Sequence, residues 1–127
     1  MIYLTIEEVY FLHELSLQKA GGRPGVRDFT LIHSAVSRPA ATFAGIDLYK
    51  DIYQKGAALI HSLILNHPFE DANKRTGFFS LNAFFHKNGY ELKFTENEGI
   101  KLCLKIENKS YSFKNIASWL KKNTRKI

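Results

Sequence analysis

The sequence NHPFEDANKRTG, residues 66–77, places a histidine, two acids, two asparagines, a lysine and an arginine between two apolar segments. The preceding segment, KGAALIHSLIL at 55–65, leaves little polar surface, and the following one, FFSLNAFF at 78–85, contains four phenylalanines. A helix that is apolar on most sides is typical of the middle of a bundle. We therefore predict that 66–77 is a polar turn between the two most buried helices, with Phe69 anchoring it in the core.

The rest of the chain favours an all-α fold of five to seven helices in one compact domain, residues 1–127. Thr5 and Glu8 form a capping-box pattern before an apolar face that includes Phe11. The expected helices run from Thr5 to the loop at 19–28, from Asp28 to Pro39, from Asp51 to about Asn66, from about Asp71 to Gly89, from Thr95 to about Ile106, and from Ser112 onward.

Three segments lack a helical period. The stretch AATFAGIDLYKD at 40–51 is predicted to be a loop or a short hairpin, and YELKF at 90–94 a short extended piece. The end of the chain, KKNTRKI at 121–127, has the composition of a frayed, solvated terminus.

Composition is typical of a globular protein, with 45% hydrophobic and 24% charged residues. No apolar run approaches the length of a membrane span, the acids Glu7 and Glu8 argue against a signal peptide, and the single Cys103 excludes an internal disulfide. We expect a cytoplasmic protein with no membrane partner. The net charge of +6 favours anionic partners, although no nucleic-acid-binding motif is present and we expect no specific nucleic-acid binding.

The second half of the motif is predicted to form the first turn of a helix. The first backbone N–H groups of a helix lack partners within it, and the helix dipole is positive at that end. Lys74 and Arg75 would add two cations beside those donors, which makes an anion site suited to a polyphosphate. Cations at this position oppose the dipole, which argues against their being ordinary surface residues.

The remaining polar residues suit phosphoryl or nucleotidyl transfer. His67, which Pro68 keeps out of the preceding helix, is placed to accept a proton from a hydroxyl. Asp71 is the candidate carboxylate for Mg²⁺, and Asn73 is a candidate for orienting a phosphate oxygen. Each residue also has a simpler interpretation: Asp71 as the N-cap of the central helix, and His67 as an ordinary turn histidine.

The segment HPFEDANKR, His67–Arg75, resembles the signature H-x-F-x-[DE]-[AG]-N-[KG]-R of the Fic/Doc family, and more closely its death-on-curing (Doc) branch. The likeness extends to GGRPGVRD at 21–28, SRPAATFAGIDLY at 37–49 and KGAALIHSLILNHPF at 55–69. It covers the chain from about Tyr3 to Leu92, and a motif of this length is highly specific.

The resemblance implies a compact helical Fic fold and a toxin of a type II toxin–antitoxin module. It implies ATP and Mg²⁺ as cofactors, with His67 as general base, Asp71 as the metal ligand, and Asn73, Lys74 and Arg75 as phosphate-binding residues. The segment from Phe43 to Tyr49 falls where the family has its target-docking flap.

Two departures from the adenylylating members indicate a kinase. Those members carry glycine where this chain has Lys74, and a second arginine where it has Phe78. In the Doc branch the same changes accompany a reversed nucleotide with its γ-phosphate near the histidine. The resemblance therefore implies a protein kinase whose target is a translation factor, elongation factor Tu.

The resemblance also implies an external inhibitor. Self-inhibiting Fic enzymes carry [ST]-x-x-x-E-[GN], but the glutamates followed by Gly or Asn here (Glu96, Glu98, Glu107) have Leu92, Phe94 and Cys103 four residues earlier. A cognate antitoxin with an acidic disordered segment would suit this basic chain.

Two alternatives remain open at this point. The first keeps the fold and changes the reaction to AMP transfer onto a protein hydroxyl. The second is a non-enzymatic module that binds an anionic partner through the lysines and arginines gathered toward the C-terminal end, although such a module has no need of His67 and Asp71.

Overall fold

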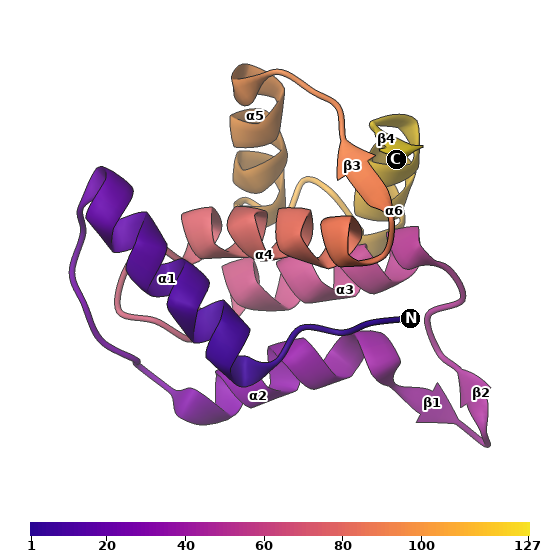
Figure 1. The fold of residues 1–127 in the computed structure, drawn as a ribbon, viewed down its shortest axis with the longest axis horizontal. Coiled ribbons are helices and arrows are strands. Elements are labelled where there is room, and N and C mark those ends of the chain that lie inside the picture. The colour runs from indigo at the N-terminus through magenta and orange to yellow at the C-terminus, as the bar shows by residue number, and fades with distance from the viewer.

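The computed structural model describes all 127 residues, and six α-helices form most of it (Figure 1). The predicted all-α class is confirmed. None of the helices combines the length and apolarity that crossing a membrane requires. The helices are α1 (Ile6–Ala20), α2 (Phe29–Ser37), α3 (Ile52–Leu65), α4 (Asn73–Lys87), α5 (Glu96–Glu107) and α6 (Phe113–Lys122), with a 3₁₀ turn, η1, at Arg38–Ala40.

The helices α3 and α4 form the centre of the molecule, as their composition predicted. They run antiparallel and side by side, with α1 and α2 on one side and α5 and α6 on the other (Figure 1). Ten of the 14 residues of α3 are buried, including the run Lys55–Ile60. Their apolar side chains join α4 in a single core cluster of 19 buried residues that also includes Phe69.

Side-chain caps start most of the helices. Thr5 with Glu8 and Thr95 with Glu98 each form the reciprocal capping box that the sequence predicted. Ser112 caps α6 and is itself bonded by Asn115, while Asp28 and Asp51 cap α2 and α3. Because each cap satisfies backbone donors that the helix cannot, the starting points of these helices follow from local sequence.

The predicted apolar face of α1 is wrong at Phe11, whose side chain is 64% exposed. Two polar residues, His13 and Ser16, lie on the buried face beside Val9. The Ser16 hydroxyl donates to the carbonyl of His13, 2.8 Å away. A polar side chain can be buried when it finds a hydrogen-bond partner inside the protein, as the Ser16 hydroxyl does, so hydrophobicity alone does not locate the buried face of this helix.

The prediction of a frayed C-terminal end is wrong. Residues Thr124–Lys126 form β4, which pairs antiparallel with β3 (Tyr90–Leu92). The strand pairing is extended by a hydrogen bond from the Lys93 N–H to the Asn123 carbonyl. The strand is basic and exposed, and its pairing partner lies more than 30 residues earlier, so its composition alone indicated solvation.

A short hairpin precedes α3, as one of the two predicted alternatives required. Its strands, β1 (Thr42–Phe43) and β2 (Ile46–Asp47), are joined by Ala44 and Gly45, which both have positive φ. The hairpin lies at the N-terminal end of α3, whereas the motif follows its C-terminal end (Figure 1). A helix of 14 residues is about 21 Å long, and this length separates the hairpin from His67 along α3.

Gly56 sets the close approach of α3 to its neighbours and provides a test of the core. A Cβ at this position would lie 3.0 Å from Phe85 Cζ and 3.1 Å from Leu81 Cδ1. Gly56→Leu should therefore lower the free energy of unfolding by about 3 kcal/mol through overpacking. Urea unfolding would measure the loss, with Ser34→Leu on the exposed side of α2 as the control. Equal effects at both positions would contradict this packing.

Candidate active site

The turn between α3 and α4 carries the motif on the surface at the edge of the core. The helix α3 ends at Leu65, with Asn66 as its C-cap, and Pro68 prevents His67 from continuing it. His67 takes a left-handed conformation with φ 49°, and it is exposed. Its carbonyl accepts a 2.6 Å hydrogen bond from Arg27 Nε. The backbone of His67 is therefore held while its imidazole faces solvent.

Phe69 anchors the turn, as predicted, through contacts on both its ring and its backbone. The ring is 1% exposed and stacks on the buried imidazole of His13, with centroids 3.8 Å apart. The side chain of Asn73 accepts from the Phe69 N–H and donates to the Phe69 carbonyl, each at 3.0 Å. His13 Nε2 also donates to the Asp71 carbonyl at 2.9 Å. These contacts determine where the turn lies.

The glycine-rich loop between α1 and α2 holds the outer side of the turn. Val26 forms an isolated antiparallel bridge with Phe69, and the N–H groups of Arg27 and Asp28 both donate to the Pro68 carbonyl. Arg23 Nη2 donates to the Glu70 carbonyl at 2.9 Å. The similarity of 21–28 to a family loop therefore corresponds here to a direct structural role in fixing the motif.

The helix α4 begins at Asn73, two residues later than predicted, and no side chain caps it. Its N-cap is Ala72, in the left-handed conformation with φ 64°. The first intrahelical bonds come from Thr76 and Gly77, which leaves the N–H groups of Asn73, Lys74 and Arg75 without partners. The interpretation of Asp71 as an N-cap is therefore wrong, and the predicted free donors are present.

The carboxylate of Asp71 is held by backbone donors. The N–H of Arg23 donates to Oδ2 at 2.9 Å, and the N–H of Ala72 donates to Oδ1 at 2.8 Å. These bonds, with the nearby charges of Arg23 and Arg75, hold the pKa of Asp71 below its usual value. The group is thus ionised, oriented and partly exposed, and each oxygen keeps a free lone pair, so it fits a role as one ligand of a hydrated Mg²⁺.

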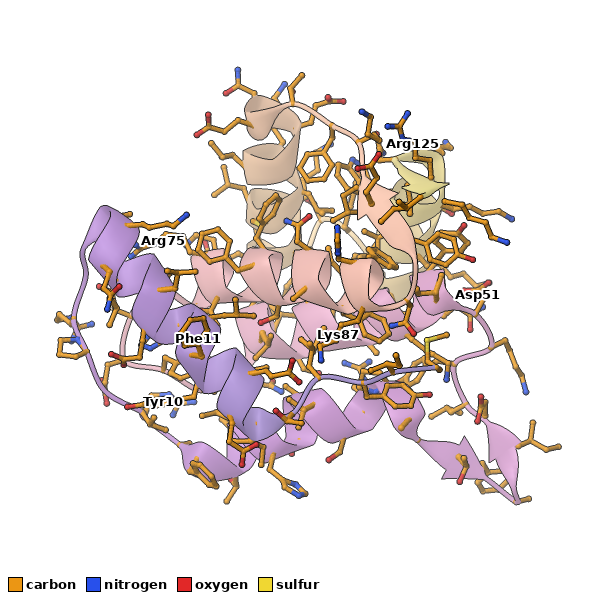
Figure 2. The ribbon with its side chains drawn as sticks, in the orientation of Figure 1. Tyr10, Phe11, Asp51, Arg75, Lys87 and Arg125 are labelled. Carbon is orange, nitrogen blue, oxygen red and sulfur yellow. The ribbon has the colours of Figure 1, made fainter.

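The two predicted cations reach in different directions. Lys74 Nζ forms an ion pair with Glu107 Oε2 at 2.9 Å, and Arg75 Nη1 donates to the Ser16 carbonyl at 2.9 Å. Figure 2 shows Arg75 beside α1, near the start of α4. Gly22, with φ +126°, allows the approach: a Cβ there would lie 2.9 Å from Arg75 Nη2 and 3.0 Å from Asp71 Oδ2.

The structure brings all five predicted site residues together, because they line one cavity of about 430 Å³. A second, mainly apolar cavity of about 530 Å³ lies between α4 and α5 and shares Lys74 and Arg75 with the first. The polar cavity is lined by His67, Glu70, Asp71, Ala72, Asn73, Lys74, Arg75 and Glu107. A ligand with a charged and an apolar part would find a matching surface for each.

The sequence does not mark several residues of the site. No local pattern distinguishes His13 within α1, and Arg23 and Arg27 lie in a loop whose partner the sequence does not indicate. Glu107 was considered only for its spacing. The arginines within a glycine-rich loop were the one sequence feature that could have indicated a role in the site. No sequence feature indicates that Glu107 pairs with Lys74, because 33 positions separate them.

Comparison with known proteins identifies the family of this chain. The model of the Fic/DOC family matches residues 3–85, which cover the chain from just before α1 through most of α4. The chain therefore belongs to the Fic/DOC family. It is 41% identical over 90 residues to Toxin Doc of Mycolicibacterium smegmatis, covering 71% of this chain and 67% of that protein. It is 29% identical over 92 residues to Protein kinase doc of Escherichia phage P1, covering 72% of each.

Asn73 provides a test of how the turn is held. Asn73→Ala leaves the buried N–H and C=O of Phe69 without partners, so the free energy of unfolding in the absence of ligand should fall by about 2 kcal/mol. Asn82→Ala on the same helix removes one long bond of 3.4 Å and is the matched control. If urea unfolding shows the same small effect for both variants, the amide does not hold the turn.

Asp71 provides a test by pH. Because its pKa is lower in the folded protein than the ordinary value of 3.8, its ionised form stabilises the fold above that value. This contribution is lost as the pH falls through the lowered pKa. The stability difference between wild type and Asp71→Asn should therefore be constant above about pH 5 and shrink below the ordinary pKa. Urea unfolding across this range would measure it, and a difference independent of pH would contradict the assignment.

Proposed function

We propose that this protein is a Doc-type toxin that transfers the γ-phosphoryl group of Mg-ATP to a serine or threonine hydroxyl of a translation factor, of the elongation factor Tu class, and so arrests translation. One observation carries the proposal. Three unpartnered backbone N–H groups and two cations lie at the start of α4, in the same cavity as the exposed His67 and the ionised Asp71. Phosphoryl transfer relies mainly on such positioning and charge neutralisation.

His67 has the position of a general base in this reaction. The hydroxyl oxygen of the target forms a bond to the γ-phosphorus, and its proton passes to the imidazole. The bond from the γ-phosphorus to the β–γ bridging oxygen breaks, and ADP leaves with that electron pair. The N–H groups of α4, with Lys74 and Arg75, stabilise the negative charge on the phosphate oxygens.

Asp71 would hold the metal ion of the reaction. When bound there, Mg²⁺ would supply positive charge that neutralises the phosphate groups. The two backbone hydrogen bonds to Asp71 keep its carboxylate ionised and fixed in orientation, so the protein part of the metal site needs no rearrangement.

Phe78 supports kinase activity over AMP transfer. Its ring packs edge-to-face on Phe94, with centroids 5.3 Å apart, and it lies against Gly99 of α5. The position of the second arginine of the adenylylating members is therefore occupied by an aromatic side chain in a packed contact, which supplies no charge for a phosphate. The apolar cavity beside it offers a surface for a nucleoside.

The toxin–antitoxin assignment rests on the named relatives and on charge. Toxin Doc and Protein kinase doc share two-thirds or more of their length with this chain. The net charge of +6 suits an antitoxin whose acidic disordered segment folds onto this protein and blocks the site.

A labelling assay tests the reaction. Purified protein, Mg²⁺ and elongation factor Tu would be incubated with ATP labelled at the γ- or at the α-phosphate. We expect transfer of the γ-label only, and a loss of at least about 100-fold in His67→Ala because the general base is removed. His86→Ala, at the exposed far end of α4, is the matched control and should retain activity.

The outcomes separate the alternatives. Transfer of the α-label would identify an AMP transferase and make Lys74 the residue whose role must be redefined. If neither label reaches elongation factor Tu, the proposed target is wrong. An absence of transfer to any protein in a cell extract would favour the non-enzymatic binding module.

A further inference from the structure

Glu107 is the one acidic side chain of the site cavity that pairs with a predicted phosphate-binding cation. It is the last residue of α5, and its Oε2 lies 2.9 Å from Lys74 Nζ. The two side chains are 37% and 44% exposed, so solvent reaches the pair. Both residues line the same polar cavity as His67 and Asp71.

Each of these charges lies at the unfavourable end of its own helix. Lys74 is in the first turn of α4, where the helix dipole is positive, and Glu107 is in the last turn of α5, where it is negative. Each charge is therefore stabilised by the opposite charge of the other, which offsets the unfavourable dipole of its own helix. A stronger anion at the start of α4 would relieve Lys74 alone, because that anion would also accept from the unpartnered N–H groups, whereas Glu107 would lose its partner.

The charges that line the cavity make the pairing of Lys74 with Glu107 relevant to phosphate binding. Three carboxylates, Glu70, Asp71 and Glu107, outnumber the two cations, and Arg75 is already engaged by the Ser16 carbonyl. Lys74 is thus the cation whose availability to a phosphate depends on a competing carboxylate, whereas Arg75 donates to a neutral backbone carbonyl. Its flexible stem allows the ammonium to leave Glu107 without a change in the backbone.

We infer that Glu107 is a competing counter-ion that occupies Lys74 in the free protein and that a polyphosphate must displace, so that Glu107 limits the affinity of the site. The inference rests on the proposed function only in that a polyphosphate binds at the start of α4. An exposed ion pair changes an equilibrium constant by at most about fivefold, so displacement is feasible at low cost. The displaced carboxylate also repels the bound phosphates.

The test is a binding measurement with inorganic tripolyphosphate, which needs neither a nucleoside nor a protein target. Isothermal titration calorimetry at low ionic strength should show that Glu107→Gln binds about 3- to 5-fold more tightly than wild type. Glu91→Gln is the matched control, because Glu91 is 35% exposed and forms an ion pair with Arg125 away from the cavity. Its affinity should stay within about twofold of wild type, since only long-range charge has changed.

A double-mutant cycle shows whether Glu107 acts through Lys74. In a Lys74→Gln background, Glu107→Gln should gain less than about twofold, because there is no lysine to release. An unchanged or weaker affinity in Glu107→Gln overturns the inference. An equal gain in both backgrounds overturns it too, since general repulsion would then explain the effect, and so does a failure of every variant to bind.

These outcomes are independent of the kinase assay. If wild type transfers the γ-label but Glu107→Gln binds tripolyphosphate no better, the kinase stands and the counter-ion role fails. If the binding pattern appears as expected but no label is transferred, the counter-ion role stands and the proposed reaction fails.

Discussion

The functional turn depends on the contacts that fix Phe69. Its ring is buried against His13, and its backbone N–H and C=O are both taken by the side chain of Asn73. Since Asn73 is the first residue of α4, the same two hydrogen bonds fix the start of that helix relative to the turn. The positions of His67, Asp71 and the free N–H groups follow from this arrangement, which stabilises an uncapped helix end beside the core.

The site concentrates charges that would be unfavourable elsewhere. An uncapped helix start, two cations near it and a carboxylate at the end of another helix all lack the partners that local structure normally supplies. The charged side chains each have a partner, Lys74 with Glu107, Arg75 with the carbonyl of Ser16, and Asp71 with the backbone of Arg23 and Ala72, whereas the N–H groups of the helix start remain free. Phosphate groups at this position would satisfy several of them at once, which is the physical basis of the proposed function.

The predictions that succeeded relied on local signals, and those that failed depended on distant contacts. The capping boxes at Thr5 and Thr95 started helices where expected, and Pro68 ended α3. The frayed C-terminus was wrong because the partner of β4 is β3, and Phe11 was misplaced because the buried face of α1 includes His13. The start of α4 shifted to Asn73 because the Asp71 side chain bonds backbone outside the helix.

The sequence by itself determined the helical class, the central pair of helices, the family and the set of residues that share the motif. Those features depend on periodicity, capping and spacing within short segments. Only the tertiary structure decided that Asn73 braces the turn, that the loop of Arg23 and Arg27 holds the motif in place, and that Glu107 pairs with Lys74. Each of these contacts joins side chains or backbone groups whose proximity depends on how whole helices pack, and no local pattern encodes that proximity.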